Sequence, residues 1–120
     1  MDEIQPELPL FAFGTLRRGE LNHHFLNGRY ERCLKARLTG FARQNPLIIV
    51  RRSGASVDGE LFYLRPETYQ ETMRGCERLE GIPAGKTVGW EYRRIEVDVK
   101  THLGTVRAWA YVHPATNPVG

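Results

Sequence analysis

The 120-residue sequence has few of the residues on which metal centres and disulfide frameworks depend. It contains two cysteines, Cys33 and Cys76, and neither lies in a metal-ligand spacing. A chain of this length can bury its own hydrophobic core, so folding does not require a disulfide. No apolar stretch approaches the roughly 20 residues that cross a bilayer, and the first residues are acidic, without the apolar segment of a signal peptide. We therefore expect a cytoplasmic protein with no membrane segment.

Several common catalytic motifs are also missing. Gly14 and Gly19 do not form a phosphate-binding loop, because Glu20 stands where that loop needs a lysine. His23 and His24 are adjacent and belong to no HExxH pattern, and no serine lies in a Gly-x-Ser-x-Gly setting. These absences argue against a P-loop nucleotidase, a zinc protease and a serine hydrolase.

The composition is that of one globular domain spanning residues 1–120, with 41% hydrophobic and 26% charged residues. The net charge is +3, and much of the positive charge lies in arginine doublets at 17–18, 51–52 and 93–94. A mild basic excess is compatible with an anionic ligand or nucleic acid. Doublets on extended segments point to opposite sides, however, so a solvated surface is the preferred interpretation and nucleic-acid binding is disfavoured.

Alternating and compact apolar patterns predict more strands than helices. The expected strands are 8–13, 30–43, 47–50, 57–64, 92–99 and 106–112. A turn at Ser53 and Gly54 would make residues 47–64 a hairpin, and Gly40 would mark a bend or bulge. Residues 1–7 are expected to be a loose lead-in.

Two helices are expected beside these strands. Residues 20–27 have apolar side chains at helical spacing, and a second helix opens at Pro66, whose missing N–H costs nothing there, and ends at Gly81. Strands that outnumber helices without alternating regularly with them indicate an α+β fold. We therefore predict a small mixed, mostly antiparallel β-barrel of five to six strands with two or so flanking helices.

The stretch after the first predicted strand is the first candidate site. The apolar run ends abruptly in Gly14, Thr15 and Leu16. Glycine permits positive φ and the close approach of a ligand, and backbone N–H groups beyond the end of a strand can form a nest for a carboxylate or oxyanion. We predict that this turn is the floor of a small-molecule pocket.

Glu80 is the second candidate. It lies in the last turn of the predicted helix, where the negative end of the helix dipole disfavours a carboxylate, and Glu77 adds a like charge three residues earlier. Both effects raise a pKa, which suits a general base at neutral pH. On chemistry alone, a solvated glutamate at a helix end is the commoner outcome.

Six segments, in sequence order, also resemble the motifs of one superfamily. They are 13–19 (FGTLRRG), 45–46 with the apolar strand that follows, 57–62 (VDGELF), 77–81 (ERLEG), 92–97 (YRRIEV) and 109–111 (WAY). They resemble the YGTLxxG, proline-led, V-x-G-E, LDxxEG, YxR and closing aromatic motifs of the γ-glutamylcyclotransferase-like superfamily, which includes AIG2-like proteins and γ-glutamylamine cyclotransferase. The resemblance covers about residues 8–112. Phe13 replaces the usual tyrosine, Cys76 and Glu77 replace Leu-Asp, and the 82–89 loop does not identify a substrate.

The resemblance implies cyclisation of a γ-glutamyl amine or amide to 5-oxoproline with release of the amine. It implies that Glu80 is the general base and acid, that no metal or cofactor takes part, and that the ligand is a small γ-glutamyl compound. The residues expected to bind that substrate are Phe13, Gly14, Thr15, Leu16, Arg94 and Tyr111. Two of these have structural alternatives: an ion pair of Arg94 with Glu96 or Asp98, and core packing of Tyr111. The competing function is a non-catalytic protein that binds γ-glutamyl or carboxylate ligands on the same fold.

Overall fold

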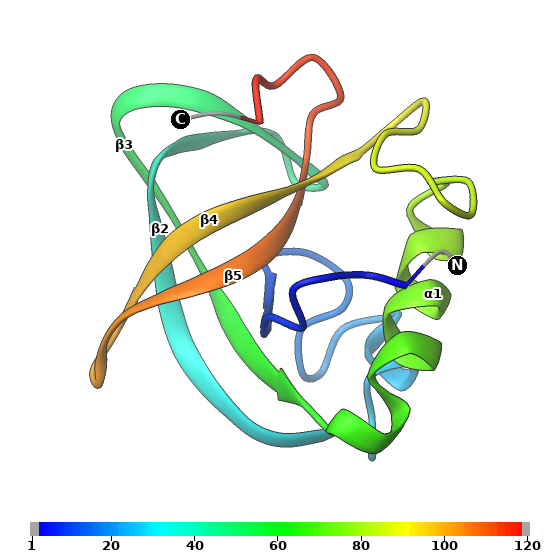
Figure 1. Cartoon of the computed structure of the whole chain (residues 1–120). Coiled ribbons are helices and arrows are strands. Elements are labelled where there is room, and N and C mark those ends of the chain that lie inside the picture. Colours follow the sequence, from blue (N-terminus) through cyan, green and yellow to red (C-terminus); the bar gives the residue numbers. More distant parts are fainter. Residues whose placement is uncertain (1–2, 119–120) are drawn as a thin grey trace.

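The computed structural model describes residues 3–118. Its elements in chain order are β1 (Leu10–Ala12), the 3-10 turn η1 (His23–Phe25), β2 (Tyr30–Asn45), β3 (Ile48–Leu64), the 3-10 turn η2 (Pro66–Thr68), α1 (Tyr69–Leu79), β4 (Arg93–Thr101) and β5 (Gly104–Val112). The strands form a closed barrel in the order β1-β3-β2-β4-β5 (Figure 1). All neighbouring strands are antiparallel except β1 and β5, which pair in parallel at Leu10 and Trp109.

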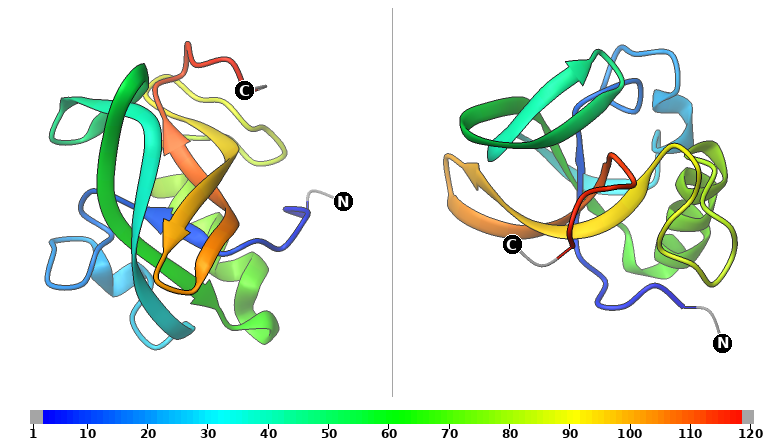
Figure 2. Two further views of the ribbon diagram at one scale, coloured as in Figure 1. Left: turned by 90° about the vertical axis from the view of Figure 1, so that its left-hand side faces the viewer. Right: turned by 90° about the horizontal axis from the view of Figure 1, so that it is seen from above.

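The predicted α+β barrel is therefore confirmed, with five strands. α1 is the one α-helix within residues 3–118, and it lies outside the barrel wall (Figure 2). The helix expected at 20–27 is wrong in extent, because the structure has only the three-residue η1 there. A segment that short, with two adjacent histidines, gains little from an isolated helical turn, since helix nucleation is unfavourable.

The expected hairpin over residues 47–64 is wrong. β3 runs unbroken from Ile48 to Leu64 and pairs with β2, and the chain reverses before it, where Asn45 Oδ1 accepts hydrogen bonds from the N–H groups of Leu47 and Ile48 (2.8 and 3.0 Å). Gly54 has φ of 82° and Gly40 has φ of 83°. Both lie where the register between the two strands shifts, so the glycine pattern marks a bulge in one long strand rather than a turn between two strands.

Two apolar clusters divide the core according to the alternation of each strand. Phe11 and Leu61 belong to the cluster inside the barrel, whereas Leu10 and Phe62 belong to the cluster between the barrel wall and α1. Met73 and Cys76 of α1 are fully buried in the outer cluster. α1 is consequently held by one face against the strands that surround the site.

The N-terminal segment is more ordered than the expected loose lead-in. Ile4 is buried, and its backbone exchanges two hydrogen bonds with the Gln70 side chain of α1 (2.7 and 3.0 Å). The Pro6 carbonyl accepts a hydrogen bond from the Trp109 indole N–H at 2.9 Å. Residues 3–7 therefore close one side of the molecule between α1 and β5, and the first two residues of that prediction lie outside the described part of the chain.

Candidate functional site

In the turn at residues 14–16, the backbone carbonyl groups are hydrogen-bonded within the protein and the backbone N–H groups are not. In chain order, the three carbonyl oxygens pair with the backbone N–H of Arg17 (3.2 Å), the backbone N–H of Asn22 (2.9 Å) and Nδ1 of His23 (2.9 Å). The Asn22 side chain also donates to Thr15 Oγ1 at 2.8 Å. Within residues 3–118, the N–H groups of the turn have no hydrogen-bond acceptor. Asn22 and His23 thus fix a turn whose amides remain available to a ligand.

Gly14 serves this turn through its small size. The sequence suggested two uses for a glycine here, a positive φ and room for a ligand, and the φ of Gly14 is not positive. A Cβ added at this position would meet no atom within 4 Å. The missing side chain therefore leaves open space beside the free amides, which is the room that a ligand needs to approach the backbone.

We expect the substitution Gly14→Ala to leave the fold intact and to weaken ligand binding. The backbone accepts alanine and the added methyl group meets no atom, so the free energy of unfolding should change by less than about 1 kcal/mol. The methyl group would occupy the space beside the amides, so the Kd of a carboxylate ligand at this turn should rise several-fold. Urea unfolding and isothermal titration calorimetry measure the two effects.

The contrasting variant is Gly59→Ala in β3. A Cβ there would collide with the Ala12 carbonyl oxygen and lie 2.8 Å from the Phe11 ring, both in β1. It should destabilise the protein by about 1–3 kcal/mol through overpacking. If Gly14→Ala destabilised the protein as strongly, the open-space interpretation of Gly14 would be wrong.

Glu80 is held in place by the end of α1. It is the C-cap residue, and Gly81 after it has φ of 76°. The N–H groups of Gly81 and Ile82 donate to the carbonyls of Arg78 (3.2 Å) and Glu77 (2.8 Å). These paired bonds form a Schellman motif, which needs a left-handed residue just after the helix. The Glu-Gly pair therefore fixes the backbone that carries the carboxylate.

The turn and Glu80 line the same cavity, which measures about 30 Å³. Its walls are Phe11, Ala12, Phe13, Gly14, Thr15, Leu16, Leu47, Glu80, Tyr92 and Tyr111. Of the seven predicted site residues, six meet here, and Arg94 does not. The Glu80 carboxylate has no hydrogen bond or ion pair to any residue in the 3–118 range.

The electrostatic surroundings raise the pKa of Glu80 to about 7. Burial is the main cause, followed by the negative charges of Glu91 and Glu77. The direction agrees with the sequence-based expectation, and so does the contribution of Glu77. The main cause differs, because burial in a cavity depends on tertiary structure that the helix sequence does not show.

Because of this raised pKa, ionised Glu80 should lower the free energy of unfolding at high pH. The folded protein holds the Glu80 proton more tightly (pKa about 7) than the unfolded chain (ordinary pKa 4.5). The stabilisation linked to that proton is complete below about pH 4.5 and is lost as the pH rises through about 7. At pH 8, Glu80→Gln should therefore be more stable than the native protein, by on the order of 2 kcal/mol.

Urea unfolding between pH 4.5 and 8 measures this difference, which should vanish toward pH 4.5. The control is Glu31→Gln, which removes an exposed carboxylate on β2 and should show no such pH dependence. A difference between native and Glu80→Gln proteins that stayed constant with pH would contradict the raised pKa.

Tyr111 brings an unpaired hydroxyl to the cavity wall. The residue is buried, and its hydroxyl makes no hydrogen bond of normal geometry within residues 3–118. Burial is the main cause that raises the pKa of Tyr111, and the nearby Cys76 and Glu77 side chains add to it. A buried hydroxyl without a partner costs stability, and an oxygen or nitrogen atom of a ligand would satisfy it.

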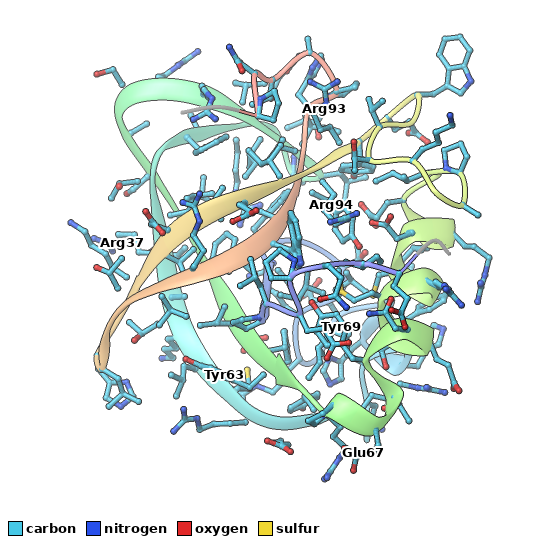
Figure 3. The ribbon with its side chains drawn as sticks, in the orientation of Figure 1. Arg37, Tyr63, Glu67, Tyr69, Arg93 and Arg94 are labelled. Carbon is cyan, nitrogen blue, oxygen red and sulfur yellow. The ribbon has the colours of Figure 1, made fainter. Side chains whose placement is uncertain are left out.

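Arg94 lies elsewhere, and neither ion-pair partner expected from the sequence is correct. Its Nε donates to Glu77 Oε2 at 3.2 Å, and both side chains are more than nine-tenths buried. Figure 3 shows Arg94 between the barrel and α1. Glu96 and Asp98 instead pair with Arg107 of the neighbouring strand. Arg94 is not among the residues that line the Glu80 cavity, and its role in substrate binding stays a prediction.

Sequence analysis missed two residues at the cavity rim. Tyr92, which directly precedes β4, donates its hydroxyl to the Leu47 carbonyl in the β2–β3 turn at 2.7 Å. The two residues come from segments 45 positions apart, so no local pattern links them. Tyr92 opens the segment 92–97 that resembles the YxR motif, but that motif does not place its side chain against Leu47.

Residues 3–118 contain no cluster of three or more His, Cys, Asp or Glu side chains that could hold a metal ion. In that same part of the chain, no helix combines the length and the apolar character needed to cross a membrane.

Comparison with protein families decides the relationship. The sequence model of the family described as γ-glutamyl cyclotransferase, AIG2-like, matches residues 10–119. The chain belongs to this family. The match of this AIG2-like chain spans all five strands and α1. By sequence alone, the curated proteins give no significant match.

Solved structures share the fold at low identity. YkqA from Bacillus subtilis superposes with a TM-score of 0.69 at 23% identity over 91% of this chain, which spans only 36% of YkqA. PH0828 from Pyrococcus horikoshii gives 0.60 at 21% identity, covering 91% of this chain and 80% of that protein. A γ-glutamyl cyclotransferase gives 0.56 at 18% identity, covering 88% of this chain and 66% of the enzyme. At these identities, the likenesses show the fold of the AIG2-like chain alone.

Proposed function

We propose that this AIG2-like protein cyclises a γ-glutamyl amine or amide to 5-oxoproline and releases the amine, with Glu80 as the general base and acid. One observation carries the proposal: a carboxylate with a pKa of about 7 shares a cavity with three unpaired backbone N–H groups. Family membership supports it.

The reaction needs a proton carrier and a site for negative charge. Glu80 takes a proton from the substrate's α-ammonium group, and the freed amine nitrogen attacks the γ-carbonyl carbon to form the ring C–N bond. Glu80 then gives that proton to the leaving nitrogen as the bond between this nitrogen and the γ-carbonyl carbon breaks. The ring nitrogen loses its second proton as the lactam forms, and that proton ends on the released amine, which leaves as an ammonium ion. The carboxylate is regenerated, so no enzyme nucleophile or redox partner is consumed.

The turn at residues 14–16 supplies the site for negative charge. Its free N–H groups are suited to hold either the α-carboxylate of the substrate or the oxyanion that forms on the γ-carbonyl. The Tyr111 hydroxyl makes no hydrogen bond of normal geometry within residues 3–118, so it is available to the same ligand. Phe13 and Leu16 provide apolar walls that favour a folded γ-glutamyl chain, and such positioning lowers the entropic cost of ring closure.

The size of the cavity adds one requirement. About 30 Å³ accommodates a water molecule or two, but not a γ-glutamyl group. The Tyr92–Leu47 hydrogen bond closes the rim, and Leu47 is half exposed in its turn. We infer that these two residues separate when the substrate enters.

The test is an assay of the native protein for 5-oxoproline release from γ-glutamyl amines, γ-glutamyl-ε-lysine and γ-glutamyl amino acids. Turnover of at least one donor supports the enzyme. If none is converted, calorimetry with the same compounds and with 5-oxoproline distinguishes the second candidate, a binding protein. The Tyr111 hydroxyl and the turn amides support the binding protein as much as the enzyme, because a bound ligand satisfies their hydrogen bonds whether or not it reacts.

A further inference from the structure

We propose that a second cavity, separate from that of Glu80, binds a small organic anion with an apolar or aromatic body. The cavity lies between the N-terminal segment, α1 and the loop that follows α1, and it has a volume of about 450 Å³. It shares no lining residue with the Glu80 cavity. Its volume is within the range of roughly 300–1,000 Å³ for small-molecule sites. This inference does not depend on the proposed reaction.

A pre-positioned guanidinium group forms the floor of this second cavity. Arg94 is 8% exposed, its Nε is occupied by Glu77, and its planar group lies 4.2 Å from the centre of the Trp109 ring. Its two Nη groups have no acceptor among the described residues. Arginine carries five N–H donors in a rigid fork, so several remain for a carboxylate or phosphate.

The rim adds positive charge. Arg74 and Arg78 lie one turn apart on the same face of α1, and Lys86 faces them from the loop. In the described part of the chain, none of the three has a carboxylate within ion-pair distance. With Arg94 these make four cations against two carboxylates, Glu3 and Glu77. The local field therefore favours an anion.

The remaining walls set the character of the ligand body. Ile4, Ile82 and Trp109 are buried and line the cavity. A fully hydrated inorganic ion would leave these apolar surfaces uncovered, whereas an aromatic or aliphatic body would bury them. The combination favours an amphipathic anion, either a carboxylate or a phosphate monoester.

The experiment is an NMR titration of the full chain with phthalate and with phenyl phosphate, with benzyl alcohol as the uncharged control. We expect saturable shifts of the amides at 84–87 and of the Trp109 indole N–H, with the anions but not with benzyl alcohol. The stronger of the two anions identifies the acidic group. The double variant Arg74→Gln/Arg78→Gln should raise the Kd at least fivefold.

The matched control is Arg52→Gln/Arg65→Gln, which removes the same charge from exposed positions outside this cavity and should leave the Kd unchanged. Absence of saturable shifts, an equal loss in both double variants, or shifts confined to the 14–16 turn and Glu80 would each overturn the proposal. The readout is binding and not 5-oxoproline, so an inactive protein would not affect its interpretation.

Discussion

Glu80→Gln is expected to lower the rate of 5-oxoproline release by about 10²–10⁴-fold, the usual contribution of a positioned acid–base group. Glutamine keeps the size of the side chain but cannot accept and return the proton. The Schellman motif depends on Gly81 and on main-chain bonds, so the fold should be retained. The measurement is kcat/KM on the best donor, together with circular dichroism of the variant.

The native enzyme should also lose activity as the pH falls through about 7, where Glu80 becomes protonated. Glu31→Gln serves as the control and should keep full activity. Turnover by Glu80→Gln close to the native rate would exclude this residue as the general base.

Arg94→Met is expected to cost about 3–5 kcal/mol of unfolding free energy, because it leaves the Glu77 carboxylate buried without its ion-pair partner. Burial already raises the pKa of Glu77, even with Arg94 in place. Methionine retains part of the packing against Trp109. Urea unfolding near neutral pH measures the loss.

The double variant Glu77→Leu/Arg94→Met is the control for this effect. Replacing both charges by apolar groups removes the buried unpaired carboxylate, so much of the stability should return. A single Arg94→Met variant that lost less than about 1 kcal/mol would show that Glu77 is not effectively desolvated. Neither residue lines the Glu80 cavity, but Glu77→Leu also removes a negative charge that raises the pKa of Glu80, so the double variant should shift the pH dependence of activity to lower pH.

The strands were predictable wherever one face of the sheet is buried. The alternation of 92–99 and the compact run of 106–112 correspond to β4 and β5, and α1 begins and ends near the proline and glycine signals. The error at 47–64 arose because a turn and a bulge both use a glycine with positive φ. Only the pairing of β3 along the whole of β2 distinguishes them, and strand pairing is not encoded locally.

Some residues of the site could likewise be predicted from the sequence, and others could not. Glu80 and the turn at 14–16 were recognisable because motif, helix end and strand end coincide in the sequence. The partner of Arg94 was not, since Glu96 and Asp98 are its neighbours in sequence while Glu77 becomes its neighbour only when α1 packs on the barrel. Tyr92, Asn22 and His23 contribute through contacts that bring distant backbone atoms together, and no periodicity reports such contacts.

The parallel pairing of β1 with β5 means that the Glu80 cavity can form only after both ends of the chain are present. β1 is three residues long, and its ladder contact with β5 joins Leu10 to Trp109, reinforced by a hydrogen bond from the Trp109 N–H to the Pro9 carbonyl. Contacts across almost the full length of a chain form late in folding, because the intervening loop must close first. On the ribosome, the first strand and the turn after it must wait for the last strand to emerge. A nascent chain of this protein would therefore carry Glu80 well before the cavity around that residue could form.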